Sequence, residues 1–110
     1  MTTNNITNER TIRLPKKIAE IIKTFVDFDY NKDLAITIYS LWKVSESEMS
    51  VILNEMQTKD LFSSSKKINA EKMSNEAEEL LELLKKELNL STEKIFAIGL
   101  YNFLKEMNKI

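Results

Sequence analysis

The stretch RTIRLP at residues 10–15 decides the expected fold of this chain. Apolar and β-branched side chains alternate here with polar ones, which is typical of a short β-strand, and the closing proline ends the pattern because it has no N–H group to give to a sheet. Alternate side chains of a strand point to opposite faces. We therefore expect Ile12 and Leu14 to point into a core, while Thr11 and Arg13 point outward.

A strand of this length is not stable alone, because its backbone donors and acceptors need a neighbouring strand. No second stretch of clear strand character lies near it in the sequence. The expected partner is the same strand of another copy, in an antiparallel ribbon about a two-fold axis with Ile12 and Leu14 in its core. A two-stranded ribbon fits the DNA major groove, where arginine can bond guanine and threonine can contact base edges.

After the strand, the apolar period changes from two to about 3.6 residues, which indicates helix. With one proline and one glycine in 110 residues, helix is expected nearly throughout. Tyr39 and Trp42 are expected on or near the buried face of the second helix, and hence packed in the core rather than stacked on bases. The expected helices are one from Lys16 to about Phe28, one capped by Asn31, one opened by a capping box of Ser45 and Glu48, one that stops at Asn89, and one capped by Ser91.

The composition excludes several classes of site. Cysteine and histidine are both absent, so there is no thiolate nucleophile, imidazole base, disulfide or usual zinc ligand. We expect no catalytic residues, no metal and no cofactor, and hence no enzyme. No apolar window approaches the roughly 18 residues of a membrane span, and the N-terminus lacks the layout of a secretory signal. A cytoplasmic protein with no membrane partner is therefore expected.

The net charge of −1 argues against a nucleic-acid partner, but the distribution of charge favours one. Residues 1–44 hold seven basic and five acidic groups, whereas residues 45–110 hold nine basic and twelve acidic groups. Within eight positions, four basic residues occur with no acidic residue between them: Arg10, Arg13, Lys16 and Lys17. Pairing of two copies would double this local charge.

Residues 9–44, with their strand, Ile- and Phe-rich helix, short turn and second helix, resemble the ribbon-helix-helix (Arc/MetJ-like) family of DNA-binding proteins. The resemblance implies that the outward strand residues read bases. On this sequence it implicates Thr11 and Arg13, with Arg10 or Glu9 at the edge of the ribbon.

The resemblance also implies that backbone N–H groups at the start of the second helix hold a DNA phosphate. Here these would be the groups of Asn31, Lys32 and Asp33. The Asp33 carboxylate departs from this pattern, because it would repel a phosphate unless it points away. Lys16 and Lys17 are expected to be further phosphate contacts.

In the C-terminal half, residues 84–95 and the helix that follows more weakly resemble the helix-turn-helix portion of a second ribbon-helix-helix unit. Its strand is missing or altered, because the segment at residues 68–73 has Glu71 where an inward apolar residue is expected. Two interpretations remain open: a tandem repeat with an altered ribbon, or a helical hairpin for oligomerisation or partner binding. The hairpin is preferred, because an acid-rich helix face is unsuited to lying near phosphates. That face consists of Glu76, Glu78, Glu79 and Glu82.

The expected fold is mostly α with one short N-terminal β-strand, as a ribbon-helix-helix dimer module followed by a C-terminal helical region. We expect the chain to divide into a disordered arm (1–8), the module (9–44), a connecting helix (45–62), a linker (63–74) and the helical hairpin (75–110). The expected function is sequence-specific binding of double-stranded DNA as a homodimer or tetramer, with transcriptional repression as the default role. Plasmid partition, conjugation and antitoxin roles use the same module. The alternative is a helical interaction or scaffold protein that does not bind DNA.

Overall fold

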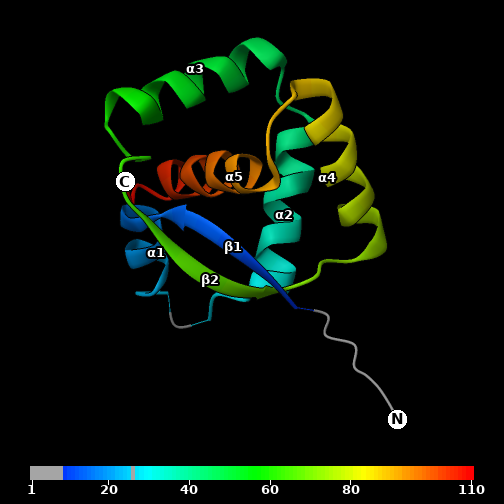
Figure 1. Cartoon of the computed structure of the whole chain (residues 1–110), viewed down its shortest axis with the longest axis horizontal. Coiled ribbons are helices and arrows are strands. Elements are labelled where there is room, and N and C mark those ends of the chain that lie inside the picture. Colours follow the sequence, from blue (N-terminus) through cyan, green and yellow to red (C-terminus); the bar gives the residue numbers. More distant parts are fainter. Residues whose placement is uncertain (1–8, 26) are drawn as a thin grey trace.

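The computed structural model describes residues 9–25 and 27–110 of the chain (Figure 1). The expected arm at residues 1–8 lies outside this part. The described residues are mostly α-helical, as the sequence predicts, but they contain two strands where one was expected. The elements in chain order are β1 (Glu9–Pro15), α1 (Lys16–Ile22), α2 (Tyr30–Trp42), α3 (Glu46–Thr58), β2 (Ser65–Glu71), α4 (Asn75–Leu88) and α5 (Thr92–Glu106).

The partner of β1 is β2 of the same chain, and the two form an antiparallel ribbon in which Ile12 lies opposite Ile68. This corrects the expectation that β1 pairs with a second copy. It also corrects the linker assigned to residues 63–74, since most of that segment is strand. Within β2, Ile68 and Ala70 are buried and Glu71 is exposed. Glu71 was expected on the inner face. The observed inward positions differ from that expectation by one residue, and a shift of one residue exchanges the two faces of a strand.

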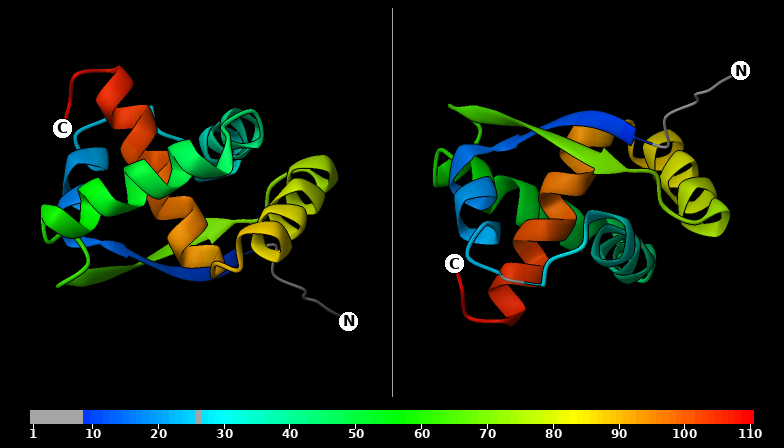
Figure 2. Two further views of the ribbon diagram at one scale, coloured as in Figure 1. Left: turned by 90° about the horizontal axis from the view of Figure 1, so that it is seen from above. Right: turned by 90° about the horizontal axis from the view of Figure 1, so that it is seen from below.

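The chain thus contains two successive strand-helix-helix units, β1-α1-α2 and β2-α4-α5, joined by α3. Figure 2 shows the ribbon along one side of the molecule, with the helices gathered on its other side. The second helices of the two units pack against each other, and each also contacts the strand of the other unit, α5 on β1 and α2 on β2. The tandem arrangement, which was not the preferred interpretation of the sequence, is therefore the one observed.

Helix α5 runs through the centre of the fold, and its residues 95–101 are all buried. It packs in a core shared with the first unit, so α4 and α5 are not a hairpin that stands apart from the rest of the fold. Gly99 lies where α5 meets α2, and a Cβ atom there would be 3.1 Å from both Leu41 Cδ1 and Thr37 Cβ. Thr37 is itself buried, and its hydroxyl donates to the Leu34 carbonyl at 2.7 Å. This close approach explains the position of the chain's only glycine.

The connecting helix α3 is observed where it was expected, with Ser45 as its N-cap and a hydrogen bond from the Glu48 N–H to the Ser45 hydroxyl at 3.3 Å. Glu55 ties α3 to α5 by accepting hydrogen bonds from the Tyr101 hydroxyl and from Lys105 Nζ, the latter at 2.9 Å. These two hydrogen bonds hold the pKa of Glu55 below its ordinary value, that from Tyr101 having the larger effect. The ribbon and α3 are therefore linked through α5.

Two local expectations are wrong. Helix α1 ends at Ile22, well short of Phe28. Tyr39 and Trp42 are exposed by 37% and 42%, although core positions were expected for them. The buried face of α2 comprises Leu34, Thr37, Ile38 and Leu41, so both aromatic side chains lie beside that face. Among the described helices, none has the length and apolar character needed to cross a membrane.

Candidate nucleic-acid interface

The outer face of the ribbon carries polar side chains from both strands. Two outward pairs flank the central pair of isoleucines: Arg13 lies opposite Lys67, and Thr11 lies opposite Asn69. The Thr11 hydroxyl donates to Asn69 Oδ1 at 3.3 Å. The exposed residues of this face in the described chain are Thr11, Arg13, Ser65, Lys67, Asn69 and Glu71.

Thr11 and Arg13 were expected to point outward, and both are exposed. Lys67 and Asn69 were missed, because the strand that carries them was not recognised. The signal was present, since Lys67 and Asn69 flank Ile68 in the same alternating way as Thr11 and Arg13 flank Ile12. The outer face therefore has twice the number of candidate reading residues that one strand supplies.

The inner face of the ribbon contains Ile12 and Leu14, which are 2% and 0% exposed. Both were expected in a ribbon core between two copies of the chain. They lie instead in a core that is complete within one chain, against buried residues of the helices such as Ile18.

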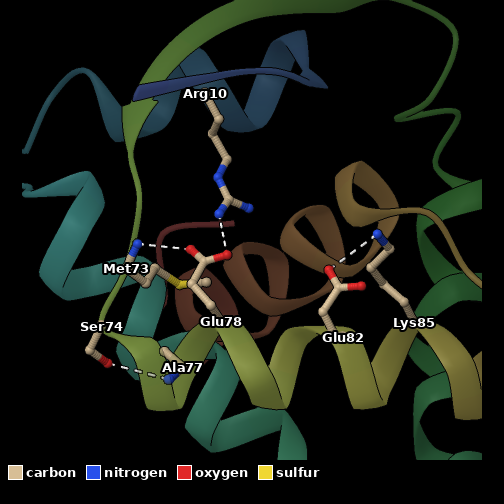
Figure 3. Close-up of polar contacts among 7 residues, drawn as sticks. All are labelled: Arg10, Met73, Ser74, Ala77, Glu78, Glu82 and Lys85. Carbon is tan, nitrogen blue, oxygen red and sulfur yellow. Dashed lines mark hydrogen bonds and ion pairs between the residues drawn. The ribbon is translucent and has the colours of Figure 1, made fainter. Parts of the chain in front are cut away.

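Arg10 lies on the inner side of the ribbon, because it is two residues from Ile12 and alternate residues of a strand point to the same face (Figure 3). Its guanidinium forms an ion pair with Glu78 Oε1 and lies 5.6 Å from the centroid of the Phe96 ring. The other Glu78 oxygen accepts the Met73 N–H at 2.9 Å. This corrects the assignment of Arg10 as a base-reading residue, since its charged group is held under the ribbon.

The start of α2 differs from the phosphate site that was expected there. Asp29, not Asn31, is the N-cap, and its Oδ1 atom accepts the N–H groups of Asn31 and Lys32 at 2.8 and 3.3 Å. The Asp29 N–H in turn donates to Asp33 Oδ2 at 2.8 Å. Of the three N–H groups expected to hold a phosphate, those of Asn31 and Lys32 are thus already bound to a carboxylate, and that of Asp33 donates to the Asp29 carbonyl at 2.7 Å. Only the exposed side chain of Lys32 remains as a candidate phosphate contact here.

Each edge of the ribbon lies beside the start of the second helix of the opposite unit. Residues 27–31 and 69–71 line a shallow groove at the β2 edge, where Asp29 and Glu71 bring negative charge. At the β1 edge, Arg13, Ser91 and Lys94 help to line a second groove of about 300 Å³. The Glu93 carboxylate lies in this second groove and accepts the Arg13 backbone N–H.

Lysine side chains gather at the end of the ribbon where Pro15 pairs with Ser65. Lys16 and Lys17 follow Pro15 directly and are exposed, as expected of phosphate contacts. Lys66 lies on the inner side of β2, where its contact with the Lys23 ammonium lowers its pKa, and burial lowers it further. This end of the ribbon is therefore strongly basic.

No protein-family model matches the sequence, and comparisons with curated proteins and with solved structures find no significant similarity. In the part of the chain that the structure describes, no three carboxylates lie close enough together to hold a metal ion.

Proposed function

We propose that the chain is a sequence-specific DNA-binding protein of ribbon-helix-helix type, in which two strand-helix-helix units on one polypeptide supply both strands of the reading ribbon. The observation that carries the proposal is the exposed outer face of the ribbon, with Thr11, Arg13, Lys67 and Asn69 projecting from a base of buried residues. Transcriptional repression is the default role, with plasmid partition and conjugation as the other roles of such a module.

The chemistry of the outer face supports this proposal. Arginine, lysine, asparagine and threonine are residue types that read base edges in the major groove, and such a groove admits a two-stranded ribbon. The lysines flanking the ribbon supply the sequence-independent part of binding, by neutralising phosphates and releasing counterions. Lys16 and Lys17 fill this role at one end of the ribbon. Lys32 and Lys94 occupy the same position in the first turns of α2 and α5.

The test is the substitution Arg13→Ala. Wild-type protein is expected to select a preferred sequence from a random DNA pool. Arg13→Ala is expected to weaken binding to that sequence by about 1–3 kcal/mol, because the arginine can no longer form its paired hydrogen bonds with a guanine. Binding to random DNA should change much less. Fluorescence anisotropy at several salt concentrations measures both affinities.

Lys43→Ala is the matched control, because it removes the same charge at the far end of α2 from the ribbon. It is expected to leave the preference for the selected sequence intact. If the wild-type protein selects no sequence, or if Arg13→Ala binds the selected DNA as tightly as wild type, the proposal is wrong.

Asp29→Asn is expected to tighten DNA binding. Asparagine still caps the helix, so the fold should be unaffected, while a negative charge beside the β2 edge is removed. The gain should be about 1 kcal/mol or less, seen with selected and random DNA alike and strongest at low salt. Anisotropy titrations measure this gain. The control for loss of one acidic charge is Glu106→Gln, at the C-terminal end of α5. Equal affinity of Asp29→Asn and wild type would place the start of α2 away from the DNA backbone.

The second candidate function is that of a helical interaction or scaffold protein that does not bind DNA. It is favoured by three exposed apolar side chains on α2, namely Ile36, Tyr39 and Trp42. This alternative predicts that the random pool yields no preferred sequence.

A further inference from the structure

We infer that the chain binds a non-palindromic DNA site in a single orientation, with G·C pairs beneath Arg13 and Lys67 and A·T pairs beneath Thr11 and Asn69. This inference rests on the proposed function and specifies the kind of DNA site that the ribbon reads.

The geometry of the ribbon is the first step. Antiparallel pairing centred on Ile12 and Ile68 places one outward pair on each side of the centre. In a ribbon made from two copies of the same strand, a two-fold axis would make those two sides identical. Here the strands differ in sequence, so one side presents Arg13 with Lys67 and the other presents Thr11 with Asn69. The reading surface therefore has two unlike halves.

The half with Arg13 and Lys67 carries hydrogen-bond donors only. Arginine and lysine side chains have no acceptor atoms, so they complement the adjacent O6 and N7 acceptors that guanine shows in the major groove. Cytosine offers an N4 donor in the groove instead, with which neither side chain can bond. This half therefore favours guanine, on whichever strand of the duplex faces each side chain.

The half with Thr11 and Asn69 is uncharged and has different chemistry. An asparagine amide can donate to N7 and accept from N6 of adenine, and a threonine methyl can contact the thymine methyl. The Thr11 hydroxyl donates to Asn69 Oδ1, which orients the amide; the second lone pair of Oδ1 can still accept from adenine N6 while the NH₂ group donates to N7. This half therefore favours A·T pairs.

Charge is also distributed unequally along the ribbon, with more positive charge at the Arg13 end than at the Asn69 end. At the Arg13 and Lys67 end, Lys16 and Lys66 add positive charge that exceeds the single negative charge of Glu93. At the other end, Glu71 and Asp29 exceed the single positive charge of Lys72. A further difference lies beneath the ribbon, where Arg10 is neutralised by Glu78, whereas Lys66 has two cations, Lys23 and Lys16, and one carboxylate, Glu20, around it. The duplex phosphates should therefore be held more closely at the Arg13 end, which favours one orientation of the protein on its site.

The first experiment is selection from a random DNA pool followed by binding of single-base variants of the selected site. The expected consensus is non-palindromic. Arg13→Ala and Lys67→Ala should each lose discrimination, by about tenfold or more, only at the G·C end, and Asn69→Ala only at the A·T end. A palindromic consensus, or loss of discrimination at both ends from a single substitution, would overturn the inference while leaving DNA binding in place.

The second experiment measures orientation directly. The natural sequence has no cysteine, so a DNA-cleaving iron chelate can be attached to one introduced thiol. Ser64→Cys puts the chelate at the Arg13 end, and Lys72→Cys puts it at the opposite end; both positions are exposed. Each variant should cut the selected DNA on one side only, Ser64→Cys beside the G·C pairs and Lys72→Cys beside the A·T pairs. Cutting on both sides by either variant would overturn the single orientation, whereas failure of wild type to select any sequence would overturn the proposed function itself.

Discussion

Replacing Ile12 with aspartate is expected to unfold the chain. Ile12 is 2% exposed and lies opposite Ile68 at the centre of the ribbon, so the new carboxylate would be buried without a partner. Such burial costs several kcal/mol, which approaches the total stability of roughly 5–15 kcal/mol typical of small domains. Circular dichroism during thermal unfolding measures the loss. For the wild type, the unfolding midpoint should not depend on protein concentration, because both strands belong to one chain.

Thr11→Asp is the matched control, because it introduces the same side chain at the adjacent, exposed position of the same strand. Its cost is expected to be about 1 kcal/mol or less. A folded Ile12→Asp variant would contradict the observed faces of β1. A wild-type midpoint that rises with protein concentration would show instead that the ribbon forms between copies.

Glu78→Ala is expected to lower the free energy of unfolding by about 2–4 kcal/mol. The Glu78 carboxylate is three-quarters buried and has two partners, the Arg10 guanidinium and the Met73 N–H (Figure 3). Its removal leaves the Arg10 charge, which is only 17% exposed, without a counter-ion beneath the ribbon. Urea denaturation followed by circular dichroism measures the change.

The control for this prediction is Glu82→Ala, one turn further along α4. Glu82 pairs with Lys85 at 3.4 Å, but its side chain is 68% exposed, so its removal should cost about 0.5 kcal/mol or less. Arg10→Met combined with Glu78→Ala should recover part of the loss, because no unpaired charge then remains under the ribbon. Equal costs for Glu78→Ala and Glu82→Ala would mean that the Arg10 pair contributes no more than a surface ion pair.

The sequence predicts the first strand well, because Ile12 and Leu14 alternate with polar residues and a proline follows. It also predicts the caps at Ser45 and Ser91, which depend on local chemistry alone. The second strand could not be recognised in the same way. Its only buried apolar residues are Ile68 and Ala70, and its stability comes from pairing with β1, which lies far away in the sequence.

The residues of the candidate site were likewise predictable on β1 but not on β2. Thr11 and Arg13 follow from alternation within β1, whereas Lys67 and Asn69 depend on recognising β2. Arg10 lies two residues before Ile12, so the alternation alone predicts that Arg10 points inward. The family resemblance had indicated an outward position at the edge of the ribbon. The N-cap at Asp29 was missed because Asn31, two residues later, is also a common capping residue.

Because β2 lies on the same polypeptide as β1, formation of the ribbon does not depend on how many molecules of the protein a cell contains. When two copies must meet to complete a ribbon, dilution separates them, and the share of complete ribbons falls with the number of molecules in the cell. Here residues 16–64 tether one strand to the other, which is equivalent to a local concentration on the order of millimolar. A cell that holds only a few molecules of this protein therefore still holds a complete ribbon in each of them.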